Sequence, residues 1–140
     1  MNIHPYLSFD GTCEEAFAAY ARCLGGTVGE MFRYGGSPMA GDVSSDWQNK
    51  IMHGSVTFSG HTLMGSDAAA PHYQTPQGFS ISLHLTDTAE AERIYGELSA
   101  GGTIQMPLAQ TFWAARFGAF VDRFGTPWTI NCEGSTTSGA

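Results

Sequence analysis

The chain repeats one pattern of short strand, helix and further strands, with the two copies 76 positions apart. Phe9 and Leu85 end the two opening strands, and Gly25 and Gly101 follow the two helices, all at this one spacing. The hydrophobic pattern repeats, whereas residue identity does not. Because each copy is one unit of supersecondary structure, the repeat predicts an α+β fold of two βαβββ modules.

Each helix can cover only one face of its sheet, so the other face must meet water, a partner or a ligand. In the opening strand, over residues 4–9, alternation places Leu7 and Phe9 toward the helix and His4 and Tyr6 away from it. The other side chains predicted to face away from the helices are His53, Ser55, Thr57, Ser80, Ser82, His84, Thr129 and Asn131.

The first helix has signals at both of its ends. Thr12 can accept a hydrogen bond from the amide of Glu15, whose carboxylate reaches back, as in a capping box. Gly25 and Gly26 end the helix, since glycine readily takes the left-handed conformation. Strands are then expected over residues 27–34, 51–58 and 61–64, with a loop over residues 35–49.

The second copy has the same signals in the same order. A strand over residues 79–85 alternates with a period of two, and Asp87 can cap a helix that ends at Gly101-Gly102. Further strands are expected around Ile104 and over residues 112–114, 119–122 and 128–132.

A chain of 140 residues is suited to a single hydrophobic core. We therefore expect one domain over residues 1–133, with module one at about 1–67 and module two at about 78–133. Residues 134–140 are glycine, serine, threonine and alanine, which have little to bury. This segment is expected to be a disordered tail.

Charge and hydropathy exclude two classes of partner. The formal net charge is −7 with only six Lys and Arg residues, too few for the basic surface that binds nucleic acid. No stretch approaches the roughly 20 apolar residues needed to span a bilayer, and the N-terminal residues do not resemble a signal peptide. We expect a cytoplasmic protein that binds neither nucleic acid nor membrane.

Three cysteines are present, and the pattern predicts that they are reduced. Cys13 and Cys23 lie ten positions apart on one expected helix, roughly 15 Å along its axis, so they cannot form a disulfide. Near a helix start, Cys13 is either a reactive thiolate with a lowered pKa or a small buried hydrophobe; the second is favoured.

Several motifs along the chain are typical of one protein family. They are Pro5-Tyr6-Leu7-Ser8-Phe9, Thr12-Cys13-Glu14-Glu15-Ala16, Met64-Gly65-Ser66-Asp67, Gln110-Thr111-Phe112-Trp113-Ala114, Asp122-Arg123-Phe124-Gly125 and Pro127-Trp128-Thr129-Ile130-Asn131. With them the chain resembles the vicinal oxygen chelate (VOC) superfamily, which includes glyoxalase I, extradiol dioxygenases and the bleomycin and fosfomycin resistance proteins. The resemblance is to its phosphonate-operon B-protein branch, also labelled demethylubiquinone methyltransferase-like.

The resemblance implies a cupped mixed sheet, as in the glyoxalase fold, and a homodimer. In metal-dependent members, ligands come from the first and last strands of each module. His4 matches the first such position, but Ser80 stands where a histidine is expected and Asn131 where a glutamate is expected. Residues 64–66 offer no carboxylate. Hydroxyl and amide oxygens do not replace imidazole and carboxylate ligands, so we expect no conventional metal site and no cofactor.

A different metal arrangement is the alternative. His4, His53 and His84 all fall on faces turned away from the helices, and three imidazoles suit a divalent zinc or iron ion. The competing interpretation is that they are hydrogen-bonded or half-exposed sheet histidines, because no pair has the short spacing typical of metal ligands.

Two further motifs each have a structural and a functional interpretation. Phe112-Trp113 either stacks on an aromatic or cationic ligand, or packs in the core or a dimer interface. Asp122-Arg123 is expected in the turn before the last strand, where an acid stabilises the loop.

The favoured function is a homodimeric small-molecule-binding protein. The residues expected to bind the ligand are His4, Tyr6, His53, Ser80, His84, Trp113 and Asn131. The alternative is a metal-dependent lyase, isomerase or dioxygenase of the glyoxalase type. Methyl transfer is a third hypothesis, disfavoured because the sequence lacks a glycine-rich strand–helix turn for a nucleotide cofactor.

Overall fold

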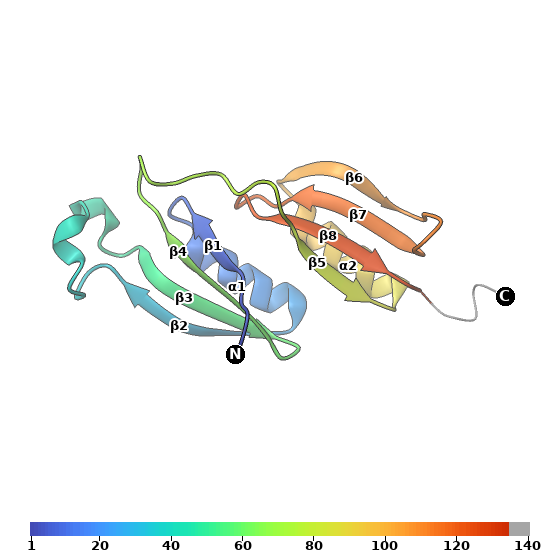
Figure 1. Ribbon diagram of the computed structural model, residues 1–140, viewed down its shortest axis with the longest axis horizontal. Helices are drawn as coiled ribbons and strands as arrows, with labels where there is room; N and C mark the ends of the chain where they lie inside the picture. Colours follow the sequence, from blue (N-terminus) through green and yellow to red (C-terminus); the bar gives the residue numbers. More distant parts are fainter. Residues whose placement is uncertain (135–140) are drawn as a thin grey trace. The chain divides into compact units, whose positions relative to one another are not determined.

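A computed structural model describes residues 1–134 of the chain, which divides into two compact units (Figure 1). The first unit spans residues 1–75, and the second begins at Pro76. Each consists of one strand, one helix and three strands, in a four-stranded mixed sheet. The predicted α+β fold of two βαβββ modules is therefore confirmed. Of the tail expected over residues 134–140, all but Gly134 lies outside the described residues.

The first unit has the strand order β1-β4-β3-β2. Strand β1 runs parallel to β4, and the other neighbours are antiparallel. Two short 3₁₀ helices, Ala40–Asp42 and Ser45–Trp47, lie within the loop between β2 and β3. The elements are β1 (Tyr6–Phe9), α1 (Cys13–Leu24), β2 (Thr27–Arg33), β3 (Ile51–Phe58) and β4 (His61–Asp67).

The second unit repeats this topology, with the strand order β5-β8-β7-β6 and β5 parallel to β8. Its elements are β5 (Ile81–Leu85), α2 (Thr88–Ser99), β6 (Thr103–Ala109), β7 (Arg116–Val121) and β8 (Pro127–Cys132). No described helix in either unit is long and apolar enough to cross a membrane.

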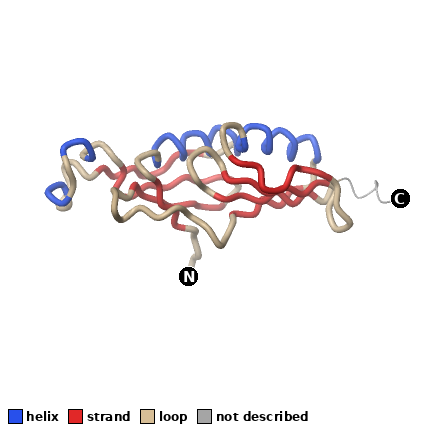
Figure 2. Tube along the Cα trace, turned by 90° about the horizontal axis from the view of Figure 1, so that it is seen from above, coloured by secondary structure: helices blue, strands red, loops and turns tan. Residues whose placement is uncertain are grey.

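Each helix lies along one face of its own sheet and covers that unit's core (Figure 2). In the first unit, Phe9 of β1 and Phe17 of α1 are fully buried and meet edge to face, with ring centroids 5.6 Å apart. In the second, Phe120 of β7 meets Tyr95 of α2 in the same way at 5.7 Å. Leu7 and Phe9 face the helix as their alternation predicts.

A Gly-Gly pair ends the helical segment of each unit, and its two glycines have different structural roles. Gly25 and Gly101 have φ angles of +70° and +77°, in the left-handed region that favours glycine. A Cβ atom on Gly26 would lie 2.2 Å from the carbonyl oxygen of Thr57. The equivalent atom on Gly102 would lie 2.1 Å from a carbonyl oxygen of β7. The second glycine therefore lets the chain pass close to a strand.

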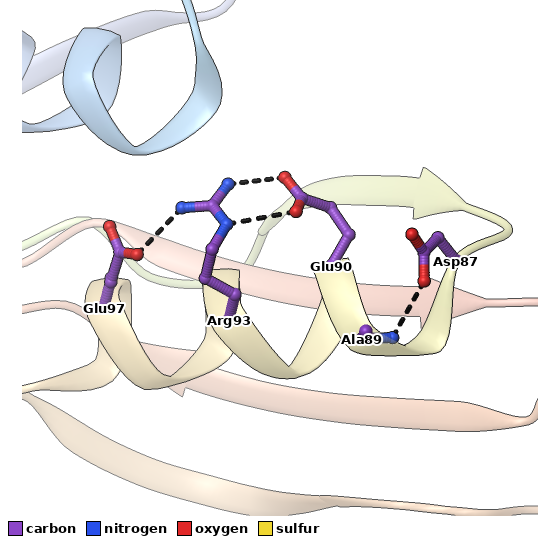
Figure 3. A network of polar contacts seen from close by, with 5 residues as sticks. All are labelled: Asp87, Ala89, Glu90, Arg93 and Glu97. Carbon is purple, nitrogen blue, oxygen red and sulfur yellow. Dashed lines mark hydrogen bonds and ion pairs between the residues drawn. The ribbon is translucent and has the colours of Figure 1, made fainter.

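The two helices start in different ways. The Thr12 side chain makes no capping hydrogen bond, so the predicted capping box is wrong. Instead Asp67, at the end of β4, accepts a hydrogen bond of 2.9 Å from the amide of Cys13. In α2 the prediction is confirmed, because the Asp87 carboxylate accepts from the amide of Ala89 at 3.0 Å (Figure 3).

An ion-pair network lies on the exposed side of α2. Figure 3 shows Arg93 between Glu90, one turn before it, and Glu97, one turn after it. All three side chains are 40% exposed or more, so these pairs contribute little to stability.

Several strand predictions need correction, and three of them concern candidate site residues. Residues 112–114 form no strand, because Thr111 and Ala114 close a turn there with hydrogen bonds of 3.0 and 3.1 Å. Strand β1 begins at Tyr6 rather than at residue 4, since Pro5 has no N–H to extend the ladder. Strand β5 begins at Ile81 rather than at residue 79, which leaves Ser80 outside it.

Candidate functional site

Three rings form a row on the face of the first sheet that α1 does not cover. Tyr6 lies on β1, His53 on β3 and Phe32 on β2, where Phe32 is directly opposite His53. The Tyr6 Oη atom lies 3.1 Å from His53 Nδ1, and the ring centroids are 5.7 Å apart. The Phe32 centroid lies 6.3 Å from that of His53. We call these three residues the ring row and this side of the sheet the open face of the first unit.

The side chains around the ring row are small and mostly hydroxylated. Strand register and alternation place Met64 between Tyr6 on β1 and Ser55 on β3. Strand register places Ser66 opposite Ser8, and Thr62 opposite Thr57, on this same face. The open face of the first unit therefore combines aromatic surface with hydroxyl groups.

Tyr34, one residue beyond β2, reaches across to the end of β4. Its hydroxyl donates a 2.7 Å hydrogen bond to the carbonyl oxygen of Asp67. Burial raises the pKa of Tyr34, and the nearby Asp67 and Tyr6 raise it further. Tyr34 is therefore a neutral phenol that holds the loop after β2 against the sheet.

The open face of the second unit carries a second group of predicted residues. His84 of β5 pairs with Asn131 of β8, which in turn pairs with Phe117 of β7. The Ser82 Oγ atom lies 3.1 Å from His84 Nε2. The Trp113 ring meets Phe117 at a centroid distance of 5.3 Å, which brings it to the same side of this sheet.

The predicted ligand-binding residues thus form one group in each unit, and two of them lie outside both groups. Tyr6 and His53 are in contact in the first unit. In the second unit His84, Asn131 and Trp113 share one region of the open face. His4 and Ser80 are exposed and precede β1 and β5 respectively.

Sequence reasoning missed two members of these groups. Phe32 and Phe117 each contact a predicted residue, but neither was selected. Alternation along 27–34 could have indicated Phe32, which is two positions before Tyr34. A β-bulge between Val28 and Met31 interrupts that alternation, so the signal is weak.

Phe112 and Trp113 are not core residues. Phe112 is 96% exposed and Trp113 is 50% exposed, so the interpretation that they pack in the core is wrong. Their rings meet at a centroid distance of 4.8 Å beside the turn that links β6 and β7. Ligand contact and a dimer interface are the two interpretations left for this pair.

A hollow of 290 Å³ opens on the other side of the first sheet, at the start of α1. Its cations are already bound within the unit: Arg33 pairs with Glu14 at 2.7 Å, and Lys50 donates to the carbonyl oxygen of Gly11 at 2.9 Å. The hydrogen bond from Arg33 lowers the pKa of Glu14. The residues that line the hollow are Gly11, Glu14, Glu15, Arg33, Asn49, Lys50, Ile51 and Asp67.

Asp67 closes the inner end of this hollow and is 1% exposed. Besides the amide of Cys13, its carboxylate accepts a 2.8 Å hydrogen bond from the amide of Ile51. Burial raises the pKa of Asp67, while these two hydrogen bonds and the charge of Lys50 act in the opposite direction. Asp67 is therefore a structural residue that joins α1, β3 and β4.

The same environment decides between the two interpretations of Cys13. Its side chain is fully buried, and burial raises the thiol pKa, as do the charges of Asp67 and Glu14. A raised pKa removes the thiolate that reactivity needs, so the reactive interpretation is wrong. All three cysteines are buried, and none forms a disulfide, which agrees with the prediction that they are reduced.

Asp122 has the structural role that was predicted for it. Its carboxylate accepts hydrogen bonds from the amides of Phe124 and Thr126 at 2.9 and 3.0 Å, and from Trp128 Nε1 at 2.8 Å. These contacts hold the turn between β7 and β8. Within residues 1–134, no three His, Cys, Asp or Glu side chains gather in a group that could hold a metal ion.

Comparisons with known proteins give matches over nearly the whole chain. A family model described as 3-demethylubiquinone-9 3-methyltransferase matches residues 1–131. Protein YjdN of Escherichia coli (strain K12) is 34% identical over 139 residues, covering 94% of this chain and 95% of that protein. Protein PA1353 from Pseudomonas aeruginosa has 47% sequence identity and a TM-score of 0.84, covering 96% of this chain and 99% of that one.

A more distant structure shows that the fold is shared more widely. The fosfomycin resistance protein FosX from Listeria monocytogenes, solved with Mn(II) and 1S,2S-dihydroxypropylphosphonic acid, has a TM-score of 0.62 at 10% identity. The match covers 99% of this chain and 96% of that one.

Proposed function

Because the chain belongs to the family described as 3-demethylubiquinone-9 3-methyltransferase, within the VOC superfamily that its motifs predicted, we propose that it is a small-molecule-binding protein. The open face of each sheet is, by itself, a surface that can bind a ligand. The family resemblance found in the sequence is confirmed, whereas cytoplasmic location stays a prediction.

The ring row is the observation that carries this proposal. Two of its rings are large and exposed: Tyr6 keeps 56% and Phe32 keeps 50% of its surface. Exposed aromatic surface surrounded by hydroxyl groups is typical of a ligand site, where rings supply contact area and polar groups fix orientation. In the second unit, His84, Asn131 and Trp113 supply the same combination of ring and polar group.

Binding is favoured over methyl transfer by the start of α1. A dinucleotide fold leaves the first amides of such a helix free for a phosphate group and uses several glycines in the preceding turn. Here the turn over residues 10–12 contains one glycine, and the buried carboxylate of Asp67 accepts from the amide of Cys13. This helix start therefore lacks both the glycine-rich turn and the free first amide of a dinucleotide site.

Native mass spectrometry of the freshly purified protein tests the proposal. We expect a retained small molecule whose occupancy falls in His53→Ala or in Asn131→Ala, according to the unit that binds it, but not in Glu97→Gln, a control on the exposed side of α2. Occupancy unchanged in both alanine variants would contradict the proposal. A near-stoichiometric divalent metal that is lost on His4→Ala would support the metal-dependent lyase, isomerase or dioxygenase instead.

A further inference from the structure

The three rings of the ring row have nearly parallel planes, and this restricts what the row can bind. The planes of Tyr6 and His53 are inclined by only 29°, and those of Phe32 and His53 by 21°. A hydrogen bond to an imidazole nitrogen lies close to the ring plane, so the Tyr6 hydroxyl meets the edge of His53 rather than its face. The three rings therefore follow one another with nearly parallel planes.

A flat ligand must stack on the outer side of Tyr6 or Phe32, the two half-exposed ends of the row, because it cannot slide between the rings. A third ring needs about 3.5 Å to each neighbour, so two rings must be about 7 Å apart to admit it. The centroids here are 5.7 Å apart for Tyr6 and His53 and 6.3 Å apart for His53 and Phe32. A flat conjugated molecule makes the largest contact with such a surface.

The ring row has no cationic partner for an anionic ligand. Among the described strand residues that register or alternation places on this face, the charged one is Glu30, two positions before Phe32, and it is an acid. Arg33 pairs instead with Ile51, on the face covered by α1, and is bound there to Glu14. An anionic group removed from water without a cationic partner is strongly disfavoured, and both Glu30 and the net charge of −7 repel it.

His53 can adapt to a polar group on the ligand. If Tyr6 donates to Nδ1, the neutral imidazole keeps its proton on Nε2 and donates there; if Nδ1 donates to Tyr6, Nε2 accepts. One ring can therefore meet a hydroxyl or a carbonyl group. The hydroxyl groups of Ser55 and Ser66 add further partners on the same face.

We propose that the open face of the first unit selects flat, conjugated molecules that carry a hydroxyl or carbonyl group and no negative charge. This inference rests on the proposed function and specifies the ligand class for one of its two faces. It excludes phosphorylated and phosphonate ligands from the ring row and disfavours saturated ones of the same size.

Three matched probes test the ligand class: 2-naphthol, its saturated analogue decahydro-2-naphthol, and 2-naphthyl phosphate. Affinities are measured with the full chain by titration, followed through the amide signals of residues 6, 32 and 53. Contact with the row is expected to make 2-naphthol bind about tenfold more tightly than either other probe. Equal affinity for 2-naphthol and the saturated analogue would overturn the inference, and so would tighter binding of the phosphate.

Two variants show whether the rings cause this selectivity. Phe32→Leu and Tyr6→Leu keep apolar volume but remove a ring. Each is expected to weaken the binding of 2-naphthol about 3- to 10-fold without affecting the binding of decahydro-2-naphthol. Phe79→Leu, which removes an exposed ring before β5, is the control. If both variants weaken both probes equally, flatness is not selected, although the open face still binds. If neither variant changes any affinity, this inference fails, whereas the proposed function fails only on the native mass spectrometry.

Discussion

Asp67 connects three elements of the first unit through one carboxyl group. It is the last residue of β4, and it accepts from the amides of Cys13 at the start of α1 and Ile51 at the start of β3. The local sequence assigned this capping role to Thr12. The hydrogen bond at the start of α1 therefore joins residues 54 positions apart, whereas the predicted bond between Thr12 and Glu15 would join residues three positions apart.

Replacing Asp67 by Asn tests this role. An amide keeps one acceptor oxygen but turns an NH₂ group toward the second backbone N–H, which leaves a buried donor without a partner. We expect a loss of about 1–3 kcal/mol in the free energy of unfolding. Urea denaturation measures it, with Asp10→Asn as the exposed control. A loss no larger than that of the control would show that Asp67 does not join these elements.

The same variant has a predicted pH dependence. Burial raises the pKa of Asp67 in the folded chain above its value in the unfolded chain, so the folded state holds more protons between those two values. The contribution of this carboxyl to stability therefore falls as pH rises from the unfolded pKa, near 3.8, through the folded pKa. The stability advantage of the wild type over Asp67→Asn should shrink across this range and stay constant above it. Urea unfolding of both proteins at a series of pH values measures this difference in unfolding free energy. A difference that widens with rising pH would contradict the prediction.

Individual residues differ in how far the sequence could predict them. The alternation of Leu7, Phe9 and Tyr6 follows from the local period of a strand, and their faces were predicted correctly. The contact between Tyr6 and His53 spans 47 positions and passes over β4, so it depends on a register that no local pattern encodes. The strand faces were therefore predictable, whereas the ring row was not.

At the scale of elements, the Gly-Gly pairs show how one helix ending meets two constraints. The predicted stop at Gly25-Gly26 is correct, but the sequence alone does not show why two glycines are needed. The first has a positive φ angle with nothing within 4 Å of a built Cβ atom, and the second lies against Thr57.

The two glycines should respond differently to alanine. Gly25→Ala places a side chain in the left-handed region, which costs about 1–2 kcal/mol. Gly26→Ala places a Cβ atom 2.2 Å from the Thr57 oxygen, so the strand must move. We expect its loss in the free energy of unfolding to exceed that of Gly25→Ala by about 1–3 kcal/mol. Thermal and urea unfolding of the two variants compare the costs. Equal losses would mean that the close approach to β3 is not maintained.

Gln48 organises the loop between β2 and β3. Its Nε2 atom lies within hydrogen-bonding distance of the carbonyl oxygens of Ala40, Val43 and Ser44, at 2.9, 3.3 and 3.3 Å. Gln48→Ala should lower the free energy of unfolding by about 0.5–1.5 kcal/mol for each hydrogen bond removed, and should make residues 40–44 sensitive to protease. Limited proteolysis checks this, with Asn49→Ala as the neighbouring control, and unchanged cleavage of Gln48→Ala would contradict it.

The whole molecule is the scale at which the sequence was most informative. The spacing of 76 positions and the motifs between Pro5 and Asn131 predicted the two-module fold and the family, both of which are confirmed. A repeat of this kind constrains topology strongly because each copy supports the same interpretation. Exposure of the aromatic pair at Phe112 and Trp113 is a property of the loop geometry, and sequence reasoning left it open.

Association into a homodimer stays a prediction, and Phe112 gives a way to test it. A phenylalanine that is 96% exposed gains about 1.5–3 kcal/mol if a partner buries it. Phe112→Ser should therefore raise the dimer Kd about tenfold or more. Sedimentation velocity at several concentrations measures the change, with Phe79→Leu as a control. A monomeric wild-type chain, or a dimer unaffected by Phe112→Ser, would leave ligand contact as the role of this pair.

The different starts of the two helices affect the order in which a growing chain can complete them. Helix α2 gains its acceptor from Asp87, two positions before Ala89, so its first turn can be capped as soon as that segment emerges from the ribosome. Helix α1 must wait for Asp67, 54 positions after Cys13, by which time all three later strands of its unit have been synthesised. During translation, therefore, the first turn of α1 can receive this cap only once its sheet has been synthesised, whereas the first turn of α2 can be capped before its sheet exists.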